Sequence, residues 1–316
     1  MKWLAGIVVV LAALGAFFWW AALDAAAPAE ANGVIDIAAY RELVANDAPE
    51  TLPTAVNVEF VGESKAPSFA VESGAFDGQR TLSYNSFQIV APSGDTIIDG
   101  AVDRETLDQM SQGKGSFSEQ TYDGVLAAMT RAQRVMITHE HLDHVMAIAR
   151  HPEPAAIAPH LNLTPEQLQG LPQHAPNGQL AAEIAGITTS DFVRPQHIAP
   201  GVVAVAMPGH SPGTILIYAK TTTREYLFIG DIAWVIGSVE HLRGRPRFIT
   251  WLMPGVDPGR PNVLRQLRAL HDVVAANPAL VLLPAHDDAY LRNLVSSGIL
   301  SEGFTEPAAA PAPTPE

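Results

Sequence analysis

The sequence predicts an α/β fold, and two observations support this prediction. Short apolar runs rich in Val, Ile and Leu, typical of buried strands, recur along the 316 residues, and segments with helix signals lie between them. Several of these apolar runs end directly in a histidine or an aspartate. Polar side chains at the carboxyl ends of strands are typical of α/β proteins, which usually hold their functional sites there.

An apolar segment begins the chain. Residues 3–23 carry no charge and include the run Phe-Phe-Trp-Trp at 17–20, which suits an interfacial aromatic belt. About twenty apolar residues can cross a bilayer, whereas the core of a cleavable signal has about 7–15. We therefore expect a membrane anchor, with a signal peptide cleaved within residues 25–29 as the alternative. Lys2 precedes the segment and the charged residues just after it, Asp24 and Glu30, are acidic, so the positive-inside rule leaves the remaining chain on the periplasmic or extracellular side; cleavage would release it as a secreted protein.

The remaining chain is expected to form one catalytic domain. Residues 1–31 make up the anchor or signal and a linker, residues 32–304 contain no repeat or Gly/Ser linker, and residues 305–316 are a Pro/Ala tail expected to be disordered. Residues 34–78 are expected either to extend the first sheet or to cover the site. The chain has no cysteine, but a core of this size is stable without disulfides.

The most informative segment is residues 138–144. An apolar run at 134–138 predicts a buried strand and residues 145–150 predict a short helix; between them stand His139, His141, Asp143 and His144. Imidazole nitrogens and carboxylate oxygens are ligands that suit zinc and neighbouring metals. A lone histidine is more often a surface or core residue than a ligand, but four candidates in six positions favour metal binding. Glu140 is expected to be exposed, and Leu142 is expected to pack.

Three later segments repeat this arrangement. The strand-like run 202–207 leads into a Pro/Gly loop with His210, the run 226–229 is followed by Asp231, and the run 280–283 is followed by His286. A sheet would bring these strand ends together. The candidate metal ligands are therefore His139, His141, Asp143, His144, His210, Asp231 and His286. His139 and His141 can share one ion, while Asp143 and His144 would face a second.

Other local signals complete the expected elements. Ser93-Gly94 predicts a hairpin between residues 86–90 and 96–99. Thr164, followed by Pro165 and Gln167, has the pattern of a helix start, and this helix would shape one wall of the cleft. Residues 261–271 also predict a helix.

A long connection follows Asp231 and contains Trp234, Arg243, Arg245 and Arg247. Two interpretations stay open: Trp234 and the arginines form the substrate pocket, where the guanidinium groups bind a carboxylate or phosphate, or the arginines belong to a solvated basic edge strand. The other histidines lack partners at ligand spacing and are expected at the surface; they are His151, His160, His174, His197, His241 and His271.

The pattern H-x-H-x-D-H, with a later His, Asp and His, resembles the metallo-β-lactamase superfamily over roughly residues 85–290. The resemblance implies an αββα sandwich of two mixed sheets with outer helices. It also implies that His139, His141 and His210 hold one ion, that Asp143, His144 and His286 hold a second, and that Asp231 bridges them. Asp99 would then anchor a ligand histidine or its loop, although an aspartate before Gly100 also suits an ordinary turn.

Details of the motif narrow the resemblance to the lactonase and glyoxalase II-like dinuclear branch. Zinc β-lactamases place Cys where this chain has Asp231, and the di-iron oxygen reductases place Glu where it has His141. The helical substrate domain of glyoxalase II is absent after His286. A formal net charge of −14 disfavours a nucleic-acid partner. Asp287-Asp288 stands where relatives often have Gly.

The ligand set predicts hydrolysis. Two divalent ions about 3.5–4 Å apart can lower the pKa of a shared water to roughly 7. Zinc is expected, with manganese or iron as alternatives. Asp231 would bridge the ions, and Asp143 would either pass a proton to the leaving group or serve only as a ligand. The expected substrate is a small ester, lactone, thioester or amide. A phosphodiesterase, or an iron-dependent oxidoreductase handling sulfur or oxygen, remains the alternative; a binding module is disfavoured because every ligand position is filled.

Overall fold

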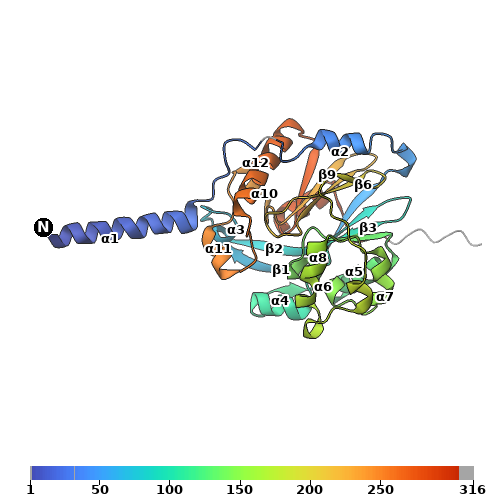
Figure 1. Ribbon diagram of the computed structural model, residues 1–316, viewed down its shortest axis with the longest axis horizontal. Helices are drawn as coiled ribbons and strands as arrows, with labels where there is room; N and C mark the ends of the chain where they lie inside the picture. Colours follow the sequence, from blue (N-terminus) through green and yellow to red (C-terminus); the bar gives the residue numbers. More distant parts are fainter. Residues whose placement is uncertain (1, 32, 306–316) are drawn as a thin grey trace, which may run out of the picture.

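The computed structural model describes residues 2–31 and 33–305, and its body is built on two mixed sheets (Figure 1). The first sheet has the order β11-β1-β2-β3-β5, with β4 paired to β1. Its strands are β1 (Ala55–Pro67), β2 (Gln79–Val90), β3 (Thr96–Ile98), β4 (Ser116–Phe117), β5 (Arg134–Met136) and β11 (Ser301–Glu302). β3 and β5 are parallel, whereas β1, β2 and β3 are antiparallel neighbours.

The second sheet has the order β10-β9-β8-β7-β6, in which β9 and β10 are parallel and the other neighbours antiparallel. Its strands are β6 (Gln196–Ala199), β7 (Val202–Ala206), β8 (Ile215–Lys220), β9 (Glu225–Gly230) and β10 (Leu280–Pro284). The inner faces of the two sheets form a shared apolar core in which Phe87 of β2 packs edge-on against Phe228 of β9. Burial of this apolar area drives the two sheets together.

Helices cover the outer faces. The longer ones are α2 (Ile37–Leu43), α4 (Arg104–Ser111), α5 (Glu119–Arg131), α6 (Leu142–Ala149), α12 (Arg260–Ala276) and α13 (Asp288–Ser296). The shorter ones are α3 (Ser68–Val71), α7 (Pro154–Ile157), α8 (Pro165–Gly170), α9 (Ala182–Ala185), α10 (Ile236–Glu240) and α11 (Arg247–Leu252). Helices α5, α6 and α7 pack on the first sheet, and α2, α10 and α12 pack on the second.

Most expected elements are confirmed. The chain has two mixed sheets with helices, and residues 34–78 extend the first sheet through β1. The predicted hairpin joins β2 to β3. At the start of α8, the Thr164 hydroxyl accepts from the Gln167 backbone N–H while the Gln167 side chain accepts from Thr164, a complete capping box. The helix predicted at 261–271 is longer, since α12 runs to Ala276.

The apolar N-terminal segment is a helix that projects from the body (Figure 1). It consists of α1 (Lys2–Phe18) and a π-helical turn, η1 (Trp19–Leu23), and together they are long and apolar enough to cross a membrane. At the other end of the chain, Thr305 bonds to Gln88 of β2, so this residue still belongs to the body. The rest of the predicted Pro/Ala tail, residues 306–316, lies outside the described residues.

Candidate metal centre

All seven predicted ligands meet at one edge of the sandwich, because each follows a strand that ends there. His139 and His141 lie on the turn after β5, and Asp143 and His144 lie in the first turn of α6. The remaining three follow strands of the second sheet: His210 on the β7–β8 loop, Asp231 after β9 and His286 after β10. The sequence therefore delivers ligands from both sheets to one place.

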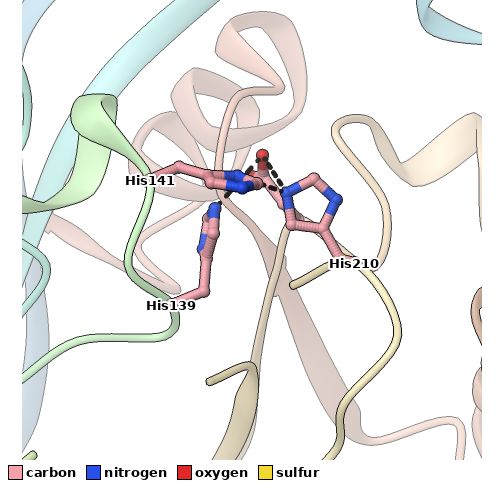
Figure 2. Close-up of side chains that lie close together, drawn as sticks. His139, His141 and His210 are labelled. Atoms are coloured by element: carbon pink, nitrogen blue, oxygen red, sulfur yellow. Dashed lines mark hydrogen bonds and ion pairs between the residues drawn. The ribbon is translucent and has the colours of Figure 1, made fainter. Parts of the chain in front are cut away.

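One group consists of His139, His141, His210 and Asp231, with ligand atoms within 4.8 Å of one another (Figure 2). The Nε2 atoms of His139 and His210 lie 3.7 and 3.3 Å from Oδ2 of Asp231. His210 Nε2 lies 2.9 Å from Nδ1 of His141. Three imidazoles thus point at a common position beside one carboxylate oxygen.

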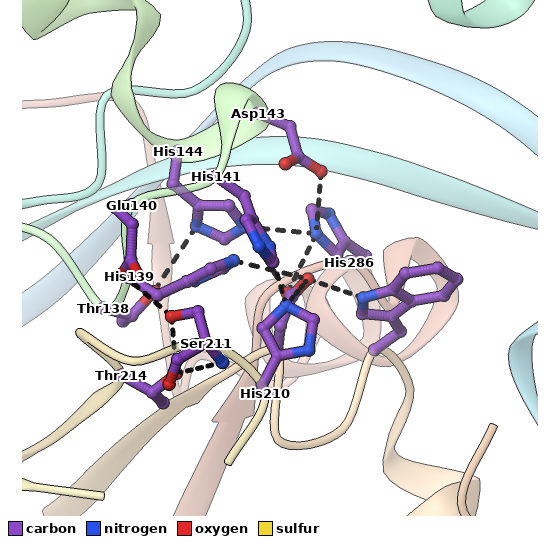
Figure 3. A network of polar contacts seen from close by, with 12 residues as sticks. Thr138, His139, Glu140, His141, Asp143, His144, His210, Ser211, Thr214 and His286 are labelled. Carbon is purple, nitrogen blue, oxygen red and sulfur yellow. Dashed lines mark hydrogen bonds and ion pairs between the residues drawn. The ribbon is translucent and has the colours of Figure 1, made fainter. Parts of the chain in front are cut away.

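A second group consists of Asp143, His144, His286 and Asp231 (Figure 3). His286 Nε2 lies 3.3 Å from Oδ2 of Asp143 and 3.0 Å from Oδ1 of Asp231. His144 Nε2 lies 3.4 Å from the same Oδ1. Asp231 therefore turns one oxygen toward each group, as expected of a residue shared by two ions.

The ring nitrogens themselves indicate that these groups fit cations. His144 Nδ1 donates to Asp99 at 3.0 Å and His286 Nδ1 donates to the Ser83 carbonyl at 2.9 Å, so in the neutral rings both Nε2 atoms carry lone pairs. Those two Nε2 atoms lie only 3.3 Å apart. Lone pairs that face each other in a buried site repel unless a proton or a metal ion lies between them. His139 Nε2 and Asp231 Oδ1 are also buried without a hydrogen-bond partner.

Charges in the site point the same way. Burial alone would raise the pKa of Asp231, but the surrounding imidazoles, led by His286 and His139, hold it well below its usual range. Burial lowers the pKa of His141 to about 4, with a contribution from His210. Burial also disfavours the charged form of His144, yet the carboxylates of Asp99 and Asp231 outweigh it and raise its pKa. The site thus combines an ionised carboxylate with imidazoles whose pKa values its negative charge shifts upward at His144, His210 and His286, a field that would equally favour a bound cation.

Residues behind the ligands fix their orientation. Asp99, which has a positive φ of 64°, accepts hydrogen bonds from the Thr138 backbone N–H and hydroxyl in addition to its contact with His144. The Thr138 hydroxyl in turn lies 3.2 Å from His139 Nδ1. The predicted anchoring contact of Asp99 is therefore present, and it reaches histidines of both groups.

A cleft of about 660 Å³ opens beside the two groups. Its walls include Met110, Trp234, Met253 and Val256, and its floor reaches His141, Asp143 and Asp231. Trp234 also donates from Nε1 to Oδ2 of Asp231 at 2.5 Å. The cleft therefore combines this apolar wall with a polar wall that includes Glu166, Gln169, Gln173 and His174.

The three arginines lie outside the lining of the cleft, and each has its own contacts. Arg245 is buried, pairs with Asp257 and stacks over the Trp234 ring. Arg247 begins α11 and pairs with Asp24. Arg243 is exposed, and its backbone forms an isolated antiparallel β-bridge with Ala26. Among the described residues that line the cleft, Trp234 is present and these arginines are not. The segment consists of two short helices, α10 and α11, and a connection in which His241 and Arg243 are exposed while residues 244–246 are buried. The acidic partner of Arg245 is one that a strand pattern does not reveal.

Several other expectations are also wrong. Glu140 is buried, because its carboxylate accepts hydrogen bonds from the Ser211 hydroxyl at 2.8 Å and the Gly213 N–H at 3.1 Å. Leu142 is half-buried and lines the cleft.

Two of the histidines expected at the surface are also less exposed. His151 is buried and bonds to the Leu126 carbonyl. His174 is half-buried, bonds to the Glu140 carbonyl and lines the cleft.

Two aspartates gain roles that the motifs did not reveal. Asp257 accepts from His210 Nδ1, although the one available signal was the turn pattern Asp-Pro-Gly that it begins. Asp287, which departs from the family pattern, caps α13 by accepting from the Tyr290 N–H and also accepts from the Ile236 N–H. Asp287 thus joins the loop after Asp231 to the segment that carries His286.

Comparisons with known proteins agree with this architecture. A search of protein-family models found no match, and no curated protein matches the sequence. Solved structures do match. An N-acyl homoserine lactone hydrolase with N-hexanoyl-L-homoserine at its catalytic metal centre is 14% identical with a TM-score of 0.55, covering 77% of this chain and 96% of its own.

Two further structures have the same architecture. A variant of a B. thuringiensis protein with N-decanoyl-L-homoserine bound at its active site is 15% identical with a TM-score of 0.56, covering 77% of this chain and 96% of its own. A probable metal-dependent hydrolase from Staphylococcus aureus is 14% identical with a TM-score of 0.54, covering 75% and 91%. At these identities the likeness concerns the fold.

Proposed function

We propose that the chain is a metal-dependent hydrolase of the metallo-β-lactamase superfamily, with two ion positions that share Asp231; its fold is that of solved hydrolase structures. The proposal rests on one observation: the two oxygens of the Asp231 carboxylate face different pairs of histidines. Oδ2 faces His139 and His210 while Oδ1 faces His144 and His286. A single ion would not require ligands on both sides of one buried carboxylate.

The proposed first ion is held by His139, His141 and His210, and the second by Asp143, His144 and His286. We propose zinc, with manganese or iron as alternatives, since imidazole and carboxylate ligands accept all three. When bound, the ions would supply Lewis acidity and a water of lowered pKa.

The protein's own groups would then position the reaction. Asp231 separates the two positions, and the Trp234 N–H holds that carboxylate in place. Asp143 is partly exposed to the cleft, with 16% of its side chain accessible, so it can reach a substrate as well as His286. We propose that it carries a proton to the leaving group, the role that its position at the cleft permits.

We propose a small ester, lactone, thioester or amide as the substrate. The cleft has an apolar wall beside polar residues and so suits an amphiphilic molecule, and two structures of this fold hold acyl-homoserine molecules at the active site or metal centre. A phosphodiester is the weaker candidate, because no Lys or Arg is among the described residues that line the cleft. The formal net charge of −14 also disfavours nucleic acid.

We also propose that residues 2–23 anchor the protein, with residues 32–304 as the catalytic domain on the periplasmic or extracellular side. The helix is apolar enough to cross a membrane and its residues up to Trp20 are exposed. A cleaved signal peptide is the alternative. The size of the mature protein in membrane fractions distinguishes the two, because cleavage would shorten the chain.

Metal content and turnover together test the hydrolase proposal. Full-length protein purified without added metal should contain two zinc-like ions per chain and should cleave at least one compound from a panel of lactones, thioesters, phosphodiesters and β-lactams. Chelation should abolish turnover, and Zn²⁺ or Mn²⁺ should restore it. A single tightly held iron with oxygen consumption would instead support the oxidoreductase alternative and overturn the hydrolase.

A further inference from the structure

A continuous apolar surface surrounds α11, where large side chains are exposed on adjoining segments. The α11 surface consists of Phe17, Trp20, Phe69, Phe76, Trp251, Leu252 and Met253. Trp251 and Leu252 are 52% and 72% exposed. Single exposed apolar residues are common in proteins, but a contiguous aromatic patch marks an interaction surface.

Ring contacts connect the parts of this surface. Trp251 stacks on Phe17 with ring centroids 6.2 Å apart and meets Trp20 at 5.6 Å. On the other side, Phe248 of α11 meets Phe69 at 6.0 Å, and Phe69 stacks on Phe76. Helix α11 therefore joins the base of the apolar N-terminal helix to the segment around α3.

The base of the N-terminal helix is attached to the body by polar contacts as well. Arg247 pairs with Asp24 at 2.6 Å and lies over the Trp20 ring. The Ser73 hydroxyl donates to the Ala22 carbonyl at 2.7 Å, and Arg260 donates to the Asp24 carbonyl. These contacts hold α11 beside the point at which the helix leaves the body (Figure 1).

We infer that the α11 surface lies in the interfacial layer of the same membrane that α1 crosses, so that the bilayer is its partner. The inference rests on the proposed anchor, because the aromatic residues that end the span stack directly on Trp251. Trp side chains favour the level of the lipid headgroups. A surface fixed beside the end of the span at that level meets lipid rather than water.

The contact is apolar in character. The chain carries a net charge of −14, so attraction to anionic lipids does not bring its body to the membrane. Burial of the exposed Trp, Leu, Met and Phe side chains supplies the favourable free energy instead. Membrane contact of α11 is therefore expected to be insensitive to salt and to the fraction of anionic lipid.

The α11 surface also borders the candidate active site. Met253 belongs to both the surface and the cleft wall, and the next residues along the chain, Pro254, Gly255 and Val256, continue that wall. A Cβ added at Gly255 would lie 3.8 Å from Nε2 of His141. The cleft thus opens next to the lipid surface, which favours an ester or lactone whose apolar tail partitions into the bilayer.

Site-directed fluorescence tests the inference directly, since the chain has no cysteine to remove. Three full-length variants, Leu252→Cys, Val193→Cys and Val9→Cys, would each be labelled with an environment-sensitive nitrobenzoxadiazole dye and reconstituted into phosphatidylcholine vesicles. Val193 is 73% exposed, like Leu252, and precedes β6, which lies away from α1 in Figure 1. Val9 lies in the proposed span and reports on the anchor alone.

We expect the dye at position 252 to emit at shorter wavelength than at 193 and to be quenched by doxyl-labelled phosphatidylcholine, with no change on adding salt. Quenching at position 9 but not at 252 would overturn the inference and leave the anchor intact. Absence of quenching at both 9 and 252 would overturn the anchor and, with it, the inference. None of these readouts depends on bound metal or on turnover, so the hydrolase proposal is tested separately.

Discussion

His210 donates a hydrogen bond from Nδ1 to Oδ1 of Asp257 at 2.9 Å, and this contact leaves its Nε2 free to face the candidate metal position. Arg245 also donates to both oxygens of Asp257, from Nε to Oδ2 at 3.0 Å and from an Nη atom to Oδ1 at 2.5 Å. Burial would raise the pKa of Asp257, but Arg245 and His210 hold it well below its usual range. Asp257 is therefore an ionised residue that orients a candidate ligand histidine.

Replacement of Asp257 should weaken metal binding at the first group. In Asp257→Asn the ionised acceptor for His210 is lost, and changes behind a metal ligand typically lower affinity by about 10–100-fold. Competition with a chromophoric chelator would show weaker retention of one ion and unchanged retention of the other. Asp123→Asn, which removes the same charge from an exposed position of α5, is the matched control and should behave as wild type.

Asp99→Asn should weaken both ions, in contrast to Asp257→Asn. Asp99 contacts His144 directly and also receives the Thr138 hydroxyl that orients His139. Asparagine tolerates the positive φ at this position, so the backbone should persist. The same chelator competition measures the effect, and loss of only one ion would show that the Thr138 contact does not position His139.

The sequence was most informative where ligands follow strands directly. His139, Asp231 and His286 each come after an apolar run, and such runs become strands whose ends meet at one edge regardless of local detail. The hairpin before Asp99 and the capping box at Thr164 were predictable for a similar reason, because both depend on residues close in the chain. Whether the seven residues hold metal ions remains a prediction.

Contacts between distant segments could not be predicted in this way. The alternate spacing of Arg243, Arg245 and Arg247 suits either a pocket wall or a solvated edge strand, yet Arg245 pairs with Asp257 in the interior. Glu140 was expected in solvent because it stands between two ligands, but the loop carrying His210 folds over it and supplies the donors from Ser211 and Gly213. In both cases the tertiary fold brings the two partners together, and no pattern of neighbouring residues in the sequence indicates the contact.

Glu140→Ala should destabilise the protein. The substitution leaves the Gly213 N–H and the Ser211 hydroxyl without their acceptor in a buried position, which costs about 1–3 kcal/mol. The Tm of thermal unfolding in detergent should fall accordingly. Glu140→Gln is the control, because its amide keeps one acceptor and the Ser211 hydroxyl can reverse to accept; it should lose less stability than the alanine variant, and an equal loss would contradict this assignment.

A second stability prediction concerns pH and lies far from the metal groups. Hydrogen bonding from Arg41 lowers the pKa of Glu225 below its ordinary value of 4.5, against the opposing effect of burial. The pair therefore stabilises the folded state fully above about pH 4.5, and this contribution is lost as the pH falls through the lowered pKa.

The difference in Tm between wild type and Glu225→Gln should accordingly be largest near neutral pH and should shrink in acid. Glu183→Gln, at an exposed position of α9, should leave the Tm close to wild type throughout. A Glu225→Gln difference that stays constant down to strongly acidic pH would contradict the assigned pair. Scanning calorimetry at a series of pH values provides the measurement.

Asp231→Asn should remove most of the activity on any accepted substrate. The amide keeps the size of the side chain but removes the negative charge between the two groups, and its NH₂ presents donors where an ion needs a lone pair. Asp231 is buried with imidazoles of four histidines around it, and it is the carboxylate that belongs to both groups. Metal analysis should find fewer than two ions per chain. The fall in kcat should be larger than the accompanying change in Tm can explain. Full turnover with two ions bound would show that Asp231 is not the shared residue, whereas Asp123→Asn should retain both ions and wild-type kcat.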